Sequence, residues 1–303
     1  MSNSLISDLL RKLASEPDRA PVDDAQAEAL LRDLAGGFSQ TNANLQALRR
    51  TMSEMYVDII AGMGGPKDRR AISCAPGQVY SQNNEDGIIA EILARIGTDT
   101  KTFVEIAAGD GIENTTRLLI DLGWSGIWVE AGDRELDCIR NIAREPLESG
   151  RLVLVDRMIT LENLDEVLMS RIDFAPDYIS VDIDYNTSHV LRRLMTLKPR
   201  LLCVEYNGHY PPSVDYEVPY RADGQWVGTT RFGASLKALE RIGRENGYSL
   251  VGCDIFGVNA FFVRDDLCSE EKFLPPFTAE AHYQPPRFSA VGMRGHGRHA
   301  NID

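Results

Sequence analysis

The sequence predicts a doubly wound α/β domain built on a parallel sheet and preceded by a helical extension. Between Gln78 and Arg264, short runs of β-branched and aromatic residues alternate with amphipathic helical stretches, which is typical of a parallel sheet with crossover helices. A chain of 303 residues, 43% of them hydrophobic, is long enough for one large domain with an appendage. The expected strands are Phe103–Ala107, Gly126–Glu130, Leu152–Asp156, Tyr178–Asp184, Leu201–Asn207 and Ala260–Val263.

Residues 1–66 are predicted to form a helical N-terminal extension. Apolar residues recur at helical spacing there, and we expect the Gly36-Gly37 pair to end one helix. Such a stripe cannot bury itself, so it packs on the neighbouring domain or forms a dimer interface, which makes a homo-oligomer the expected assembly. The stripe comprises Leu5, Leu9, Leu10, Leu13, Leu30, Leu31, Leu34, Leu45, Leu48, Met52, Met55 and Tyr56.

Gly64, Gly65 and Pro66 mark a linker, and the α/β domain is expected over residues 67–268. Residues 269–303 are rich in Pro, Gly, His and Arg, and we predict that they form a loosely ordered tail. The histidines of this stretch lack the tight spacing of a metal site, so we interpret His282, His296 and His299 as surface residues.

Composition favours a cytoplasmic protein without membrane or nucleic-acid partners. The formal net charge of −13 makes a nucleic-acid partner unlikely, since such proteins usually carry a basic face. No run approaches the ~20 apolar residues of a membrane helix, and the N-terminus lacks a signal-peptide pattern. The cysteines are Cys74, Cys138, Cys203, Cys253 and Cys268; their spacing is unpaired, which indicates reduced thiols.

The segment Phe103-Val-Glu-Ile-Ala-Ala-Gly-Asp-Gly111 predicts a strand that ends in a glycine-bearing turn. Gly109 and Gly111 allow close approach of the backbone to a ligand. The loop lacks the phosphate-loop lysine, and Glu105 and Asp110 would repel a pyrophosphate, which disfavours a nicotinamide dehydrogenase. Acidic residues in and before this loop favour a cationic ligand such as a sulfonium.

Two further acids end the next two expected strands. Glu130 lies 19 positions after Gly111, close to the ~20-residue offset at which a carboxylate binds ribose hydroxyls. Asp156 ends the third strand, where we expect it to contact an adenine amino group. The alternative is that these acids are solvated strand ends.

The chain resembles the FkbM-like class I methyltransferases from about Tyr80 to Asp265. The resemblance implies a seven-stranded methyltransferase (Rossmann-like) sheet, S-adenosylmethionine as cofactor, and acceptors such as sugars and secondary metabolites. Ala107 stands where the motif often has glycine, and Tyr185 follows Asp184 where glycine is usual. The segments that carry the resemblance are Tyr80–Ile89, Phe103–Asn114, Trp124–Glu130, Tyr178–Asp184, Val204–Asn207 and Phe232–Leu236.

Contacts with the cofactor are expected from the segment before the first strand, from the glycine loop with the turn after it, and from the ends of the later strands. Ser81, Gln82 and Asn83 either close over the methionine end or, as part of Asn83-Asn84-Glu85-Asp86, simply cap a helix over 87–96. The predicted cofactor-binding residues are Ser81, Gln82, Asn83, Glu105, Ala107, Gly109, Gly111, Asn114, Thr115, Glu130, Asp156 and Asp182.

A divalent metal site is predicted where the fourth and fifth strands end. Side chains alternate along a strand, so Asp182 and Asp184 point the same way, as do Glu205 and Asn207. Four oxygen-bearing side chains would then converge, and Mg²⁺ or Mn²⁺ takes such ligands. The arrangement resembles metal-dependent O-methyltransferases of the catechol and macrolide-sugar kinds, although Tyr206 falls where a ligand is expected. Alternatively, Asp182 or Asp184 contacts cofactor or substrate directly.

The expected activity is methyl transfer to a hydroxyl of a sugar or secondary metabolite. A base would accept the hydroxyl proton, and the candidates are His209 and, as a second choice, His189, which can equally be a packing residue. The aromatic insertion Tyr210–Trp226 either binds the acceptor or fills a satellite core. The alternatives are a metal-independent N- or C-methyltransferase and a non-catalytic interaction module.

Overall fold

The computed structural model describes residues 24–62, 68–75, 77–288 and 299–302. Its internal contacts divide the chain into two units, Met1–Arg49 and Arg50–Asp303. The leucine stripe predicted at Leu5, Leu9, Leu10 and Leu13 lies outside the described residues. Of the helices in the described ranges, none combines the length and apolarity needed to cross a bilayer.

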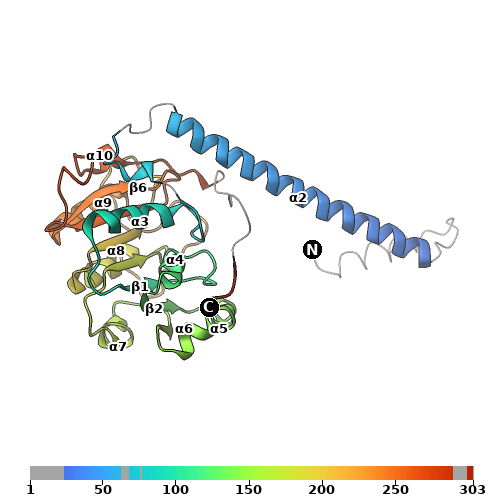
Figure 1. Ribbon diagram of the computed structural model, residues 1–303, viewed down its shortest axis with the longest axis horizontal. Helices are drawn as coiled ribbons and strands as arrows, with labels where there is room; N and C mark the ends of the chain where they lie inside the picture. Colours follow the sequence, from blue (N-terminus) through green and yellow to red (C-terminus); the bar gives the residue numbers. More distant parts are fainter. Residues whose placement is uncertain (1–23, 63–67, 76, 289–298, 303) are drawn as a thin grey trace. The chain divides into compact units, whose positions relative to one another are not determined.

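Helix α2 runs without a break from Asp24 to Gly62 (Figure 1). The expectation that Gly36-Gly37 ends a helix is therefore wrong. A glycine inside a helix costs about 1 kcal/mol relative to alanine, which lowers stability locally but does not remove a backbone hydrogen bond as proline would. Good helix formers on both sides, from Ala27 to Leu34 and from Leu45 to Arg50, carry the helix through the pair.

Residues 68–288 contain a seven-stranded sheet in the order β3-β2-β1-β4-β5-β7-β6 (Figure 1). The strands β1 to β5 are parallel, and β7 runs antiparallel to both of its neighbours. This confirms the predicted seven-stranded, doubly wound Rossmann-like sheet. The strands are β1 Thr102–Ile106, β2 Ser125–Glu130, β3 Leu152–Asp156, β4 Tyr178–Val181, β5 Leu201–Glu205, β6 Tyr248–Cys253 and β7 Asn259–Arg264.

Helices cover both faces of this sheet, so each strand buries alternate residues on opposite sides. Val104 and Ile179 face one core cluster with residues of α8 and α9, whereas Phe103 and Trp128 face a second cluster with residues of α3 and α5. The helices are α3 Glu85–Ile96, α4 Arg117–Asp121, α5 Asp133–Ile142, α6 Arg144–Glu148, α7 Leu164–Val167, α8 Thr187–Leu194, α9 Leu236–Glu245 and α10 Ala279–His282, with 3₁₀ turns η1 Ile72–Cys74, η2 Met169–Arg171 and η3 Met195–Leu197.

The described residues after Ser269 are packed, which corrects the expectation of a loosely ordered tail. Phe273 and Ala279 are fully buried. Near the C-terminus, the Ile302 amide donates to the Ile142 carbonyl at 2.7 Å, and the Arg117 guanidinium donates to the Asn301 carbonyl at 2.6 Å. His282 is half-buried rather than a surface residue, and His296 lies outside the described residues. The cysteine prediction is confirmed for four side chains, which are free thiols.

Gly126 lies at a tightly packed point of the sheet. A Cβ at this position would lie 2.5 Å from the carbonyl oxygen and from a ring carbon of Phe103 on the neighbouring strand. We expect Gly126→Ala to lower the free energy of unfolding by about 2–4 kcal/mol, measured by urea denaturation. The adjacent Ser125→Ala should stay within about 0.5 kcal/mol; equal effects of the two changes would contradict this account of the packing.

Candidate active site

The loop after β1 is held by backbone donors that point at the end of β2. The amides of Ala107 and Ala108 donate to the Val129 carbonyl at 2.9 and 3.1 Å, and the Gly109 amide donates to Glu130 Oε2 at 2.8 Å. Ala107, Gly109 and Gly111 all have positive φ values of 60–77°. Glycine adopts this region freely, whereas alanine pays about 1 kcal/mol or more. The loop tolerates Ala107, as expected, at the cost of local strain.

Glu105 is buried on β1 and holds the turn that follows the glycine loop. Its carboxylate accepts hydrogen bonds from Asn114 Nδ2 at 2.6 Å, from the Thr115 amide and hydroxyl at 2.8 Å each, and from the amide and hydroxyl of Thr116. Burial raises the pKa of Glu105, and these donors oppose the rise. Each oxygen already accepts at least two hydrogen bonds, so Glu105 positions the loop, and its predicted contact with a cofactor stays a prediction.

A cavity of about 330 Å³ opens where β1, β2 and β4 end. It brings together four of the predicted residues: Ala107, Glu130, Asp182 and Asp184. Residues 157–159, in the loop after β3, were not predicted, whereas the lining residues between 222 and 226 belong to the aromatic insertion for which acceptor binding was one of two expectations. The full lining comprises Ile106, Ala107, Val129, Glu130, Ala131, Arg157, Met158, Ile159, Asp182, Ile183, Asp184, Asn186, Ala222, Gly224, Gln225 and Trp226.

Asp156 does not line this cavity, contrary to the expectation that it meets an adenine. Its carboxylate forms an ion pair with Arg140 at 2.7 Å on the surface. Arg157, Met158 and Ile159 line the cavity instead. Met158 is 50% exposed, so an apolar surface large enough to contact a planar base is available there. Nothing in the local pattern distinguishes these residues from an ordinary loop.

Three carboxylates meet where β4 and β5 end. One oxygen each of Asp182, Asp184 and Glu205 lies within 4.8 Å of the others. Asp182 and Asp184 are open to the cavity and Glu205 is half-buried. Glu205 Oε2 is a buried atom without a hydrogen-bond partner among the described residues. Asp184 has a φ of +56°, a left-handed conformation that Asp tolerates better than most residues.

The crowding of these acids disfavours their ionised forms. Burial raises the pKa of Asp182 to about 6, and the charge of Asp184 contributes to the rise. Burial and the charges of Asp182 and Asp184 raise the pKa of Glu205 well above its ordinary value. Two nearby carboxylates share protons unless a cation separates them. The cluster is therefore suited to bind either a proton or a divalent cation.

Asn207 does not join this cluster, which corrects its assignment as a metal ligand. Its side chain is fully buried and donates to the carbonyls of Thr230 and Phe232 at 2.8 and 2.9 Å. Its Oδ1 accepts a hydrogen bond from the His209 amide at 3.2 Å. The alternation argument fails because β5 ends at Glu205, and beyond that point the chain turns. Asn207 instead anchors the loop before α9.

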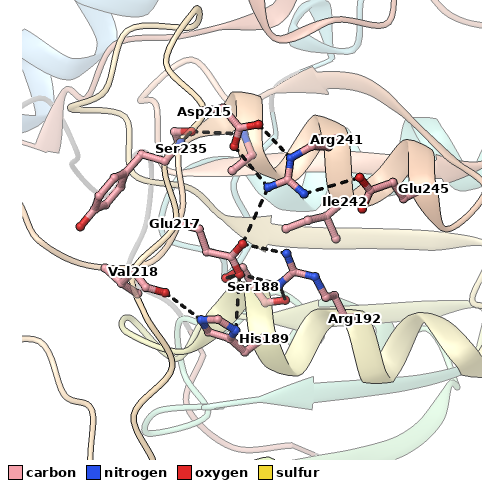
Figure 2. Close-up of polar contacts among 12 residues, drawn as sticks. Ser188, His189, Arg192, Asp215, Glu217, Val218, Ser235, Arg241, Ile242 and Glu245 are labelled. Atoms are coloured by element: carbon pink, nitrogen blue, oxygen red, sulfur yellow. Dashed lines mark hydrogen bonds and ion pairs between the residues drawn. The ribbon is translucent and has the colours of Figure 1, made fainter.

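His189 lies in an ion-pair network, not at the cavity (Figure 2). Its Nε2 is 2.8 Å from the Val218 carbonyl, and its Nδ1 is 3.4 Å from Glu217. Both ring nitrogens are thus engaged, so the assignment of His189 as a base is corrected in favour of packing. In the same network, Arg192 and Arg241 contact Glu217 at 2.5 and 3.8 Å. These contacts fasten the aromatic insertion to α8 and α9.

His209, the preferred base, does not line the cavity either. Its exposed ring packs against Phe232 and Phe288, with centroid distances of 6.5 and 5.8 Å. Tyr210 and Tyr216 stack on each other at 4.4 Å, so this part of the insertion fills a satellite core. Trp226, by contrast, lines the cavity and is 51% exposed.

The segment before α3 is held by two acids in the first turn of that helix, although the N-cap residue Asn84 makes no side-chain capping hydrogen bond. Asp86 Oδ2 accepts the amides of Val79, Tyr80 and Ser81 at 2.7–2.9 Å, and Asn83 Nδ2 donates to Glu85 at 2.9 Å. Ser81, Gln82 and Asn83 do not line the cavity. Their predicted cofactor contacts stay predictions.

Comparison with protein-family models finds no match, and comparison with curated proteins finds none. Among solved structures, the glycopeptide N-methyltransferase MtfA with S-adenosylhomocysteine is 16% identical, covering 62% of this chain and 89% of its own, at a TM-score of 0.35. A candidate O-methyltransferase from Klebsiella pneumoniae is 17% identical (72% and 97% covered, TM-score 0.42). The N-terminal domain of EvdMO1 with S-adenosylhomocysteine bound is 15% identical (61% and 80% covered, TM-score 0.39).

Repulsion within the acidic cluster makes stability depend on pH. An acid whose folded-state pKa exceeds its unfolded value is destabilising once pH rises above the folded pKa, and neutral below the unfolded pKa. For Asp182 that window runs from the ordinary value of 3.8 to about 6. In chelator, Asp182→Asn should therefore raise the melting temperature at pH 8 by roughly 1–3 °C, because solvent screens the repulsion of a side chain that is open to the cavity, and change it little at pH 4.

Asp156→Asn is the matched control, because it neutralises a surface acid that has an arginine partner. Melting curves of both variants at the two pH values check the assignment. An equal shift for Asp182→Asn at both pH values would contradict it.

Proposed function

We propose that this protein is an S-adenosylmethionine-dependent O-methyltransferase that uses a divalent metal. The observation that carries the proposal is the convergence of Asp182, Asp184 and Glu205 beside a cavity that the glycine loop also borders. In open α/β sheets, ligands bind in the crevice outside the carboxyl ends of the strands. The cavity occupies that place in this sheet.

The features of the cavity match the parts of the proposed cofactor. Glu130 receives three amide hydrogen bonds, from Gly109, Ala131 and Gly132, and a carboxylate has about four lone-pair sites. One acceptor site of Glu130 therefore remains for a ribose hydroxyl. Met158 and Ile159 offer an apolar wall for the base. Asp182 and Asp184 supply negative charge for a sulfonium, and no pyrophosphate would be favoured next to them.

The carboxylate cluster fits a hard divalent cation such as Mg²⁺ or Mn²⁺. Asp182, Asp184 and Glu205 would hold it, because cations of this kind take oxygen ligands and relieve repulsion between carboxylates. Glu205 Oε2 is buried without a hydrogen-bond partner among the described residues. A bound cation would supply the positive charge that no donor supplies there. When bound, the cation would lower the pKa of an acceptor hydroxyl and fix its direction.

The chain's own residues then have three tasks. The walls of the cavity orient the acceptor oxygen in line with the sulfonium, so that an O–C bond forms as the C–S bond breaks. A carboxylate oxygen of the acidic cluster that is not bound to the cation accepts the hydroxyl proton. Gln225 and Trp226 limit the access of water from the side of the insertion.

A sugar hydroxyl or a hydroxyl of an aromatic secondary metabolite is the acceptor that this wall supports best. Trp226 presents an exposed ring at the cavity, and its indole N–H is bound to the Thr229 carbonyl at 2.6 Å. That hydrogen bond fixes the plane of the ring, so a flat apolar face of an acceptor can pack on it. A metal-independent N- or C-methyltransferase would need no cation at the cluster, and a non-catalytic module would bind no cofactor.

Cofactor binding at Glu130 is tested by titration with S-adenosylhomocysteine. We expect Glu130→Ala to raise the calorimetric dissociation constant about 30-fold, because both the ribose contact and the hydrogen bond to Gly109 are lost. Asp133→Ala removes an equal charge from the exposed start of α5 and should leave affinity within about twofold. Unchanged affinity of Glu130→Ala would refute the ribose role, and no binding by the native chain would refute the proposal.

Metal binding is tested separately, by calorimetric titration of the native chain with Mn²⁺. Binding of one ion is expected, and Glu205→Gln should weaken it at least ~100-fold while affinity for S-adenosylhomocysteine is retained. Asp156→Asn should bind Mn²⁺ as the native chain does. Absence of Mn²⁺ binding, or equal binding by Glu205→Gln, would favour the metal-independent alternative.

A further inference from the structure

Helix α2 carries a stripe of exposed apolar side chains along its length. Between about half and three quarters of each residue is open to solvent, from 49% for Ile59 to 72% for Phe38. Isolated apolar residues on a surface are ordinary, whereas a continuous stripe on one helix marks a contact surface. The stripe consists of Leu34, Phe38, Leu45, Leu48, Met52, Met55 and Ile59.

The spacing of this stripe follows a heptad repeat. Steps of three and four residues alternate from Leu45 to Ile59, and the same register extends back to Leu31. An average repeat of 3.5 residues keeps a stripe on one side of two helices that supercoil around each other, whereas a single straight helix drifts away from it. Position a is filled by Leu31, Phe38, Leu45, Met52 and Ile59, and position d by Leu34, Thr41, Leu48 and Met55.

The helix has little to stabilise it on its own. Gly36, Gly37, Asn42 and Asn44 interrupt its middle with weak helix formers. Exposed short-range pairs lie on its described surface, such as Arg32 with Glu28 at 2.9 Å, and such pairs contribute little. Most helices in proteins are stabilised by packing of an apolar face. A helix of 39 residues with these interruptions requires a partner along its stripe.

We propose that the partner is a second copy of the chain, with the two α2 helices forming a two-stranded coiled coil. The seam spans residues 31–59, about 42 Å at 1.5 Å per residue. No charged residue stands at an a or d position, so the stripe is complementary to itself. At the flanking positions, Asn44 would face Arg49 of the second copy, with no repulsion between like charges.

The experiment measures the molar mass of the full chain in solution by light scattering coupled to size exclusion, over a range of concentrations. We expect the native chain to have twice the mass of one 33.7 kDa chain. The double variant Leu45→Glu, Leu48→Glu places charges in the seam and should raise the dissociation constant for self-association at least ~100-fold. The control Ser39→Glu, Gln46→Glu adds the same two charges at exposed positions outside the seam and should remain dimeric.

Titration with S-adenosylhomocysteine checks that the seam variant is folded, because the folded variant should bind this ligand with the affinity of the control. A native chain that is monomeric throughout, or a seam variant that stays dimeric like the control, would overturn the proposal. Assembly of α2 with a different protein while the purified chain remains monomeric would also overturn it.

Discussion

Electrostatic repulsion among three carboxylates is the constraint on which the proposed site depends. Asp182, Asp184 and Glu205 place oxygens within 4.8 Å of one another, and burial raises the pKa of the first to about 6. The chain holds them there because β4 and β5 pack side by side between two apolar layers. Sheet packing contributes far more free energy than the repulsion costs, so the rigid fold maintains a locally unfavourable cluster.

Acidic residues in this domain fall into two groups according to their hydrogen bonds. Glu105 and Asp254 accept several amide or hydroxyl donors each, and they fix loops around the sheet. Glu205 lacks such donors at one buried oxygen. A carboxylate saturated with donors organises the backbone, whereas an unsaturated one at a cavity is available to a ligand. The satisfied acids thereby hold the available ones in position.

Local pattern was sufficient to predict the sheet and its main acidic positions. Glu130 and Glu205 end β2 and β5 as expected, but β4 ends at Val181. Asp182 and Asp184 therefore converge through the turn after the strand, in which Asp184 has a positive φ, and not through alternation along a strand. Local pattern failed where contacts distant in sequence decide: Asn207 is bound by the loop at 230–232, and His189 is bound by the insertion at 217–218. Strand β6 was missed because Gly252 and a register shift interrupt its pattern. No local signal marks Met158 as a cavity residue, whereas Trp226 belongs to the aromatic insertion that was one candidate for acceptor binding.

The central claim is that the acidic cluster holds a cation beside the methyl donor. Anomalous diffraction from crystals grown with S-adenosylhomocysteine and Mn²⁺ tests it most directly. The account predicts one strong manganese peak within coordinating distance, ~2.0–2.6 Å, of oxygens from Asp182, Asp184 and Glu205, with the nucleoside between Glu130 and Met158. A nucleoside bound there without manganese at the three carboxylates, or manganese elsewhere only, would contradict it.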